Sequence, residues 1–245
     1  MPPQRVVSLV PSITELIVWL GRGEALVGRT RFCTQPAEFV GRIAVVGGTK
    51  NPRIERVIQL RPDLVIANKE ENREVDVSAL RSAGLDVLVT DPNSVPEAVT
   101  MTRELGATLG AADRAQGLAH EVAKAIDRVP SGSAVPIYVG VWHNPMMGLG
   151  SQSYGHSLIE MCGGRNVLGN RPRYPEVTFD QLRGMAPDLI LLPDEPFPFD
   201  ESHVGYYGAV APARPIDGKL MWWYGPRMPQ AIRALSAVFD EVRVR

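Results

Sequence analysis

The chain has 245 residues, of which 44% are hydrophobic and 22% charged, and its formal net charge at pH 7 is −1. This length suits one large domain or two lobes of about 100–120 residues each. A near-neutral charge without a basic run argues against nucleic acid as a partner. No apolar stretch reaches the ~18 residues that a membrane-spanning helix needs, so the composition is that of an ordinary globular protein.

The N-terminal sequence predicts a strand at Val6–Leu9 that is followed at once by a helix. Ser12 and Glu15 have the spacing of a capping box, and apolar residues recur at helical spacing over Ile13–Leu20. Residues 1–5 lack the charged, apolar and cleavage regions of a secretory signal. We therefore expect a cytoplasmic protein as the chain is written, or a periplasmic or cell-surface protein if a signal was removed.

Strands and helices alternate along the rest of the chain. Further strands are expected at 27–30, 64–67, 87–90, 137–141 and 189–192, and helices at 76–83, 94–109, 111–129, 156–161, 180–185 and 230–242. Such alternation predicts an α/β fold of two similar lobes, with mostly parallel sheets flanked by helices and a ligand cleft between the lobes. The lobes are expected at 1–110 and 131–245, joined by one long connecting helix at 111–130.

A helix–turn–strand pattern occurs twice, at 54–66 and at 179–191. Each copy reads as a short amphipathic helix, a Pro-Asp turn and an apolar strand. Glu55 and Asp180 occupy the same position near the start of the two helices, where the helix dipole favours an acid without any partner. The repetition indicates two lobes built on one plan.

Five features, taken in order, resemble one known family. They are Arg5–Glu15, Gly47–Pro52, the two Pro-Asp-Leu strands, Asn68–Asn72 and Cys162–Asn166. Together they are similar to the substrate-binding proteins of the helical-backbone class (class III), which deliver vitamin B12, haem and iron–siderophore complexes to ABC importers. The resemblance covers nearly the whole chain, and it looks closest to the cobalamin-binding branch. It implies two lobes joined by one long helix.

The resemblance also implies partners. The ligand would be a small-molecule metal chelate, and the membrane subunits of an ABC importer would bind Glu55 and Asp180 through arginines. The helix-dipole explanation of these two acids stays open. Nucleic acid is not expected as a partner, and the protein is expected to be a monomer.

Ligand-binding residues are expected in the loops at the strand ends. Three of the four tryptophans lie in these loops, and aromatic faces suit a flat macrocycle. Adjacent Trp222 and Trp223 cannot easily point the same way, so one is expected at the cleft, with a lobe core as the alternative for each. The expected ligand-binding set is Phe32, Lys50, Asn68, Lys69, Trp142, His143, Tyr174, Glu195, Trp222, Trp223, Tyr224 and Arg227.

Two further features bear on the chemistry of the ligand. His143 is either a contact to the ligand or its metal, or an ordinary hydrogen-bonding residue. Cations at Lys50, Lys69, Arg173 and Arg227 would suit anionic groups on a ligand that differs from cobalamin.

No catalytic or metal-binding motif is recognisable in the sequence. The four histidines lack the spacing of a zinc site, and neither a Walker sequence nor Gly-x-Ser-x-Gly occurs. We expect no enzyme activity, no bound metal and no intrinsic cofactor, and we expect Cys33 and Cys162 to be buried thiols. The expected function is to hold a cobalamin-like ligand, haem or an iron–siderophore in the interlobe cleft for an ABC importer. The alternative is a cytoplasmic carrier, sensor or unrecognised enzyme on the same fold without an importer.

Overall fold

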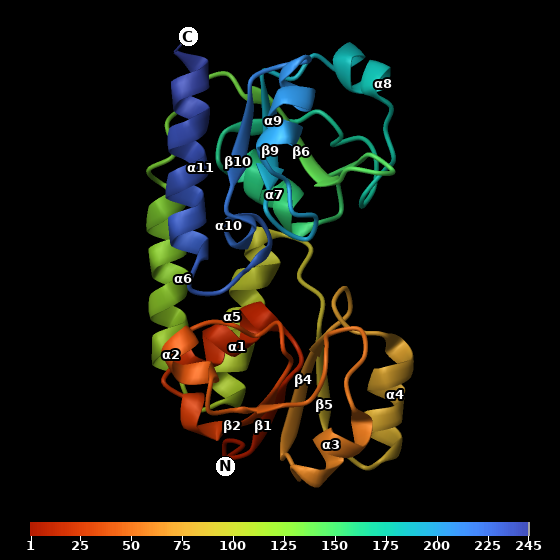
Figure 1. Ribbon diagram of the computed structural model, residues 1–245. Helices are drawn as coiled ribbons and strands as arrows, with labels where there is room; N and C mark the ends of the chain where they lie inside the picture. Colours follow the sequence, from red (N-terminus) through yellow and green to blue (C-terminus); the bar gives the residue numbers. More distant parts are fainter. Residues whose placement is uncertain (245) are drawn as a thin grey trace. The chain divides into compact units, whose positions relative to one another are not determined.

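The computed structural model describes residues 1–244, whose contacts divide them into two compact units (Figure 1). The first unit comprises Met1–Asp91, Val99–Ala119 and Tyr224–Pro226, and the second comprises Pro92–Ala98, His120–Trp223 and the chain from Arg227 onward. Each unit has a largely parallel sheet flanked by helices, so the expected fold class of two α/β lobes is confirmed. Helix α6 (Ala112–Ile126) occupies most of the range expected for the connecting helix.

The first unit is built on a parallel sheet with the strand order β3-β2-β1-β4-β5. Its strands are β1 (Val6–Ser8), β2 (Leu26–Arg29), β3 (Ala44–Val45), β4 (Leu64–Asn68) and β5 (Val87–Thr90). The helices that follow them are α1 (Pro11–Trp19), the short η1 (Gly23–Ala25), α2 (Ala37–Val40), α3 (Ile54–Gln59), α4 (Glu74–Ser82) and α5 (Val95–Thr108). Every residue of β4 is buried, as expected for a strand with neighbours on both sides and cover on both faces.

The sheet of the first unit and two of its helices share one core. Val7 of β1 and Val65 of β4 pack with Val57 of α3 and with Val77 and Leu80 of α4, and all five side chains are buried. The spacing of Val77 and Leu80 places both on the inner face of their helix. Full burial of each such side chain contributes about 1.5–3 kcal/mol, and this core fixes the strand ends on which the candidate site depends.

Helix α1 begins differently from the sequence prediction. It starts at Pro11, its N-cap is Val10, and no side chain makes a capping hydrogen bond. Proline suits the first helical position because it has no amide hydrogen to satisfy there and its φ is already helical. The capping box predicted for Ser12 and Glu15 is therefore wrong.

The second unit has the strand order β10-β9-β6-β7, and β8 also pairs with β6. Its strands are β6 (Val135–Trp142), β7 (Met147–Gly148), β8 (Gly164–Asn166), β9 (Leu189–Pro193) and β10 (Ala213–Ile216). Its helices are α7 (Tyr154–Met161), α8 (Phe179–Gly184), α9 (Glu201–Gly208), α10 (Gly218–Trp222) and α11 (Met228–Arg243). Strand β7 is antiparallel to β6, whereas the other pairings are parallel. The strands and helices expected between 137 and 242 are confirmed.

A core of aromatic and aliphatic side chains fills one face of the second sheet. Tyr138 of β6 and Ile190 and Leu192 of β9 pack with Phe199 and with Tyr207 of α9. The rings of Tyr138 and Tyr207 stack with their centres 6.3 Å apart. This core supports α9 and the loop that precedes it.

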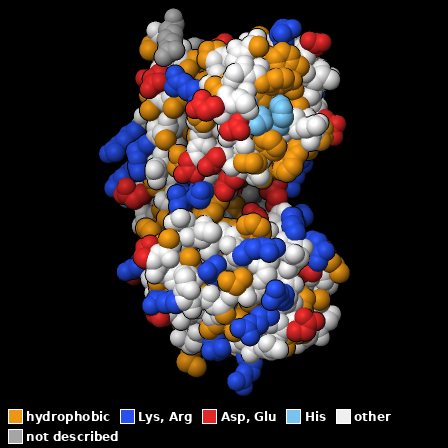
Figure 2. Space-filling model, in the orientation of Figure 1, with side chains coloured by type: hydrophobic (Ala, Val, Ile, Leu, Met, Phe, Trp, Pro, Cys, Tyr) orange, Lys and Arg blue, Asp and Glu red, His pale blue; other side chains and the backbone are white. Residues whose placement is uncertain are grey.

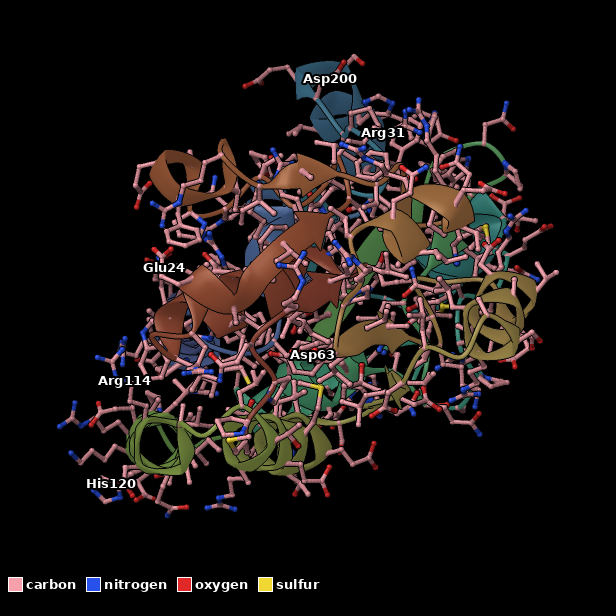
Figure 3. All side chains as sticks on the ribbon, turned by 90° about the horizontal axis from the view of Figure 1, so that it is seen from below. Glu24, Arg31, Asp63, Arg114, His120 and Asp200 are labelled. Atoms are coloured by element: carbon pink, nitrogen blue, oxygen red, sulfur yellow. The ribbon has the colours of Figure 1, made fainter. Side chains whose placement is uncertain are left out.

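The two copies of the helix–turn–strand pattern fold alike. The amide of Asp63 donates to the carbonyl of Arg5 at 2.7 Å, and the amide of Asp188 donates to the carbonyl of Pro136 at 2.8 Å. Each bond ties the Pro-Asp turn to the start of the neighbouring strand. In the first copy the carboxylate of Asp63 (labelled in Figure 3) also accepts the amides of Gln4 and Arg5, at 2.8 and 2.9 Å. Both lobes thus follow one plan.

Both cysteines are buried free thiols, as expected. Burial raises the pKa of Cys162 to about 12 and also raises that of Cys33, so both are thiols rather than thiolates near neutral pH. Within residues 1–244, no helix has the length and apolar character needed to cross a bilayer.

Candidate functional site

The parallel strands bring four of the expected ligand-binding residues to one edge of the first unit. Phe32 follows β2, Lys50 follows β3, Asn68 ends β4 and Lys69 comes directly after it. Because neighbouring parallel strands end at the same edge, residues that follow them gather there.

Asn68 organises the loop after β4 from within. Its side chain is only 3% exposed. Its Oδ1 accepts the amides of Glu70 and Glu71, at 2.9 and 3.1 Å, while its Nδ2 donates to the carbonyl of Thr90 at 3.0 Å. These bonds satisfy a buried amide, so Asn68 shapes the edge rather than presenting a side chain at its surface.

Asn72 completes this arrangement and was missed by the sequence reasoning. Its Oδ1 accepts the amide of Asn68 at 2.8 Å, and its Nδ2 donates to the carbonyls of Leu9 and Thr49, at 3.3 and 2.9 Å. One buried side chain thus joins the loops that follow β1, β3 and β4. The sequence singled out Asn72 only as the end of the Asn68–Asn72 feature, because burial of a polar side chain leaves no local signature.

The remaining predicted residues at this edge are exposed. Lys50 donates from Nζ to the carbonyl of Glu70, and Lys69 forms an ion pair with Asp91 at 2.9 Å. Phe32 is 52% exposed. The guanidinium of Arg31 lies 5.4 Å from the centre of its ring, a cation–π distance. An exposed aromatic face with a cation beside it suits a flat ligand that carries anionic groups.

Tyr224 lies inside the first unit and not on its surface. Its side chain is buried, and its hydroxyl forms hydrogen bonds with the side chains of Ser12 and Thr90. Burial raises the pKa of the phenol, and the nearby carboxylate of Glu71 raises it further. The phenol is therefore neutral at any physiological pH.

Trp142 is an exposed aromatic residue at the end of a strand in the second unit. It is the last residue of β6, whose preceding residues are almost all buried, yet its own side chain is 40% exposed. Its ring lies edge-on to Phe197, with the ring centres 5.3 Å apart, and its Nε1 donates to the carbonyl of Asn144 at 3.1 Å. The indole is held in place while one part of its surface faces solvent.

His143 belongs to a cluster of rings on the same unit. Its ring lies 4.6 Å from that of His203 and 5.3 Å from that of Tyr206, and its Nδ1 is 3.4 Å from the hydroxyl of Tyr207. Figure 2 shows histidine surface among hydrophobic side chains on this unit. Burial lowers the pKa of His143, and His203 lowers it further. A neutral imidazole that can accept a hydrogen bond or bind a metal is therefore favoured.

The loop after β9 and the two adjacent tryptophans form one hydrogen-bonded group. The Nε1 of Trp222 donates to the carbonyl of Glu195 at 2.6 Å, and the side chain of Trp223 forms a hydrogen bond with the Glu195 carboxyl group. Burial raises the pKa of Glu195, although the charge of Lys219 opposes this. Trp223 is only 7% exposed, whereas Trp222 is half-buried.

Three further predicted residues are half-buried in the second unit, namely Arg173, Tyr174 and Arg227. The guanidinium of Arg227 lies 5.3 Å from the ring centre of Trp223. Arg173 has a left-handed backbone, with φ of 60°, and its Nη1 donates to Asn93 Oδ1 at 2.7 Å. These contacts hold both guanidinium groups in defined positions.

The two acids of the repeated pattern are exposed in the first turns of α3 and α8. The side chain of Asp180 is 92% exposed and lies 3.7 Å from Arg183, within ion-pair distance. Glu55 forms no ion pair with any other described residue. Both carboxylates are thus accessible to a partner.

Residues 1–244 contain no group of three or more His, Cys, Asp or Glu side chains placed to hold a metal ion. His120 is exposed, and its side chain points outward from α6 (Figure 3).

Two α/β units, each with an exposed aromatic residue at or shortly after the carboxyl end of a strand, are the arrangement expected of a two-lobed binding protein. The chain belongs to the periplasmic binding protein family, whose sequence profile matches residues 6–201.

Binding proteins are among the relatives of similar sequence. A vitamin B12-binding protein of Salmonella choleraesuis is 28% identical over 193 residues, which cover 77% of this chain and 71% of that protein. An uncharacterised ABC transporter substrate-binding lipoprotein of Bacillus subtilis is 29% identical over 206 residues, covering 78% of this chain and 64% of that protein.

Solved structures share the fold over the whole chain. The periplasmic vitamin B12-binding protein of Vibrio cholerae superimposes with a TM-score of 0.86 at 18% identity, covering 100% of this chain and 99% of that one. A periplasmic haem-binding protein of Pseudomonas aeruginosa gives a TM-score of 0.84 at 23% identity, covering 97% and 92%. These structures confirm the fold, and the profile match over residues 6–201 confirms the expected family.

Proposed function

We propose that this chain is the substrate-binding protein of an ABC importer and that it binds a metal chelate, namely a cobalamin-like compound, haem or an iron–siderophore. The observation that carries the proposal is Trp142, an indole fixed at the end of a buried strand with 40% of its surface exposed. A planar aromatic surface held in this way favours stacking with a flat macrocycle. The names of the vitamin B12- and haem-binding relatives support this class of ligand.

The proposed ligand contacts are the accessible members of the expected set. In the first unit they are Phe32, Lys50 and Lys69, and in the second they are Trp142, His143, Tyr174, Glu195, Trp222 and Arg227. Asn68, Trp223 and Tyr224 are buried, so we assign them supporting roles. The expected cleft between the lobes stays a prediction.

The membrane subunits of an importer are the proposed protein partner. Glu55 and Asp180 are exposed acids at equivalent positions, and two such charges would orient a complex more than they tighten it. The proposed location is periplasmic or at the cell surface, which is supported by the periplasmic and lipoprotein relatives.

A titration with cyanocobalamin, haemin and a ferric siderophore tests the ligand class. Absorbance and tryptophan fluorescence report binding, because Trp142 and Trp222 are both proposed contacts. We expect at least one compound to bind with a Kd below about 10 μM. If none of the three binds in that range, the metal-chelate proposal is rejected.

A further inference from the structure

A short segment from late in the chain is built into the first unit. Tyr224–Pro226 belongs to this unit, although the residues on either side belong to the second. Gly225 has a φ of 95°, and a Cβ added there would lie 3.3 Å from Cβ of Leu16. The close approach and the left-handed backbone both favour glycine. The segment is thus fitted to the place where it lies.

The buried hydroxyl of Tyr224 has a defined place in a hydrogen-bond network. Thr90 Oγ1 donates its one proton to the carbonyl of Ala67 at 3.1 Å and accepts from Nδ2 of Asn68 at 3.2 Å. The phenol also shares hydrogen bonds with the side chains of Thr90 and Ser12. In the arrangement in which Thr90 donates to Ala67, Tyr224 donates to Thr90 and Ser12 donates to Tyr224.

The network continues from Thr90 to the surface of the sheet edge. Asn68 bonds to Thr90 with its Nδ2 and holds the amides of Glu70 and Glu71 with its Oδ1. Those two amides lie in the loop that begins with Lys69, one of the proposed ligand contacts. A displacement of Thr90 would therefore be transmitted through one side chain to this loop.

We propose that Tyr224 is a positioning residue, whose hydroxyl fixes Thr90 and Ser12 and thereby holds the loop of residues 69–71 in its ligand-binding form. The expected effect on ligand affinity rests on the proposed function. The expected ordering of the loop does not depend on a ligand. Buried, fully satisfied polar networks rigidify the elements that they join.

Replacing Tyr224 by phenylalanine tests the proposal, because the ring remains and only the hydroxyl is lost. Tyr138→Phe is the matched control, since within residues 1–244 the buried Tyr138 hydroxyl has no hydrogen-bond partner. Hydrogen–deuterium exchange measured on the whole chain gives the direct readout. We expect the amides of Glu70 and Glu71 to exchange about fivefold faster in Tyr224→Phe, as for the loss of one ordinary hydrogen bond, and not to change in Tyr138→Phe.

Thr90→Val provides a second route to the same result, because it removes the hydroxyl that connects Tyr224 to Asn68. It should accelerate exchange at the same two amides. Unchanged exchange at Glu70 and Glu71 in Tyr224→Phe would overturn the proposal. So would an equal acceleration across α1 and β4, which would show that the hydroxyl supports general packing only.

Cyanocobalamin and haemin then separate the two proposals. If wild type binds either probe, Tyr224→Phe should weaken that binding at least threefold, about the effect of one hydrogen bond, and Tyr138→Phe should not. Unchanged affinity would overturn the ligand-binding part of the proposal. If wild type binds neither probe, the cobalamin and haem assignments fail, while the exchange measurement still decides whether Tyr224 orders the loop.

Discussion

Arg61 and Ala186 hold the same left-handed backbone conformation, with φ of 45° and 46°, at the same position of the two helix–turn–strand copies. Each residue follows the C-cap of its helix and stands directly before a proline. A left-handed residue at this position ends a helix and turns the chain away from it. Because neither residue is glycine, both copies carry the strain of this conformation. The two copies therefore share the same strained backbone conformation at the end of the helix.

Ala186→Gly should stabilise the protein. Glycine adopts a left-handed conformation without strain. Relief of this strain stabilises the folded chain by about 1–2 kcal/mol, which exceeds the destabilisation caused by the larger conformational entropy of the unfolded chain. The free energy of unfolding from urea titration should rise by about 0.5 kcal/mol. The control is Ala209→Gly at the C-cap of α9, which is also exposed but has a right-handed backbone with φ of −69°. The control should lower the free energy of unfolding. An equal decrease in both variants would show that the backbone at Ala186 is not strained.

Asn72→Ala should lower the free energy of unfolding by about 2 kcal/mol, because it leaves buried backbone groups without partners. The groups affected are the carbonyls of Leu9 and Thr49 and the amide of Asn68. Asn170→Ala, at an exposed asparagine, is the control and should have little effect. A small effect in both variants would mean that Asn72 does not join the three loops.

The pH dependence of stability should contain a contribution from His143. Its pKa in the folded protein lies below the ordinary value of 6.5 because of burial and the nearby His203. Between these two pKa values the unfolded chain binds more protons than the folded chain, so stability rises with pH in that window. The contribution of His143 to stability is complete above pH 6.5 and is lost as the pH falls towards the pKa of His143 in the folded protein.

Urea unfolding at about pH 5 and about pH 8 tests this sign. The groups that face His143 are His203 and Tyr206 of α9 and the hydroxyl of Tyr207. His143→Asn should reduce the loss of stability at the lower pH, whereas His120→Asn, at an exposed site, should not. A pH dependence that is unchanged by His143→Asn would show that another group causes it.

Charge reversal at Glu55 and Asp180 tests docking to an importer. The double variant Glu55→Arg and Asp180→Arg should weaken association with the membrane subunits in liposomes at least about tenfold, with ligand binding unchanged. Glu38→Arg and Glu201→Arg form the control pair, because they also replace exposed acids in first helical turns. If both pairs behave alike, only the helix-dipole role of Glu55 and Asp180 remains.

The sequence predicted the architecture well, because periodicity depends on local chemistry. The apolar run at 64–67 falls within β4, and the helix expected at 111–129 contains α6, which is shorter at both ends. Shorter elements such as β3 and β10 were not predicted. Strand β10 contains Arg214 and Pro215 and lies at the edge of its sheet, where proline is tolerated but the apolar signal is weak.

The candidate site was predicted only in part. Positions that follow strands could be found from the pattern, and Trp142 and Phe32 are exposed there. Asn68 and Tyr224 were grouped with them, but both are buried by contacts with residues distant in the sequence. Tertiary burial of a polar side chain has no local signature, so their supporting role, like that of Asn72, emerged only from the structure.

The most direct test of the proposed function compares two tryptophans of nearly equal exposure. Trp142 is 40% exposed at the end of β6, and Trp19 is 42% exposed on α1. Titration of wild type, Trp142→Ala and Trp19→Ala with cyanocobalamin and haemin should show binding by wild type, at least about tenfold weaker binding by Trp142→Ala, and no change in Trp19→Ala. Equal affinities of wild type and Trp142→Ala for the probe that binds would contradict the account.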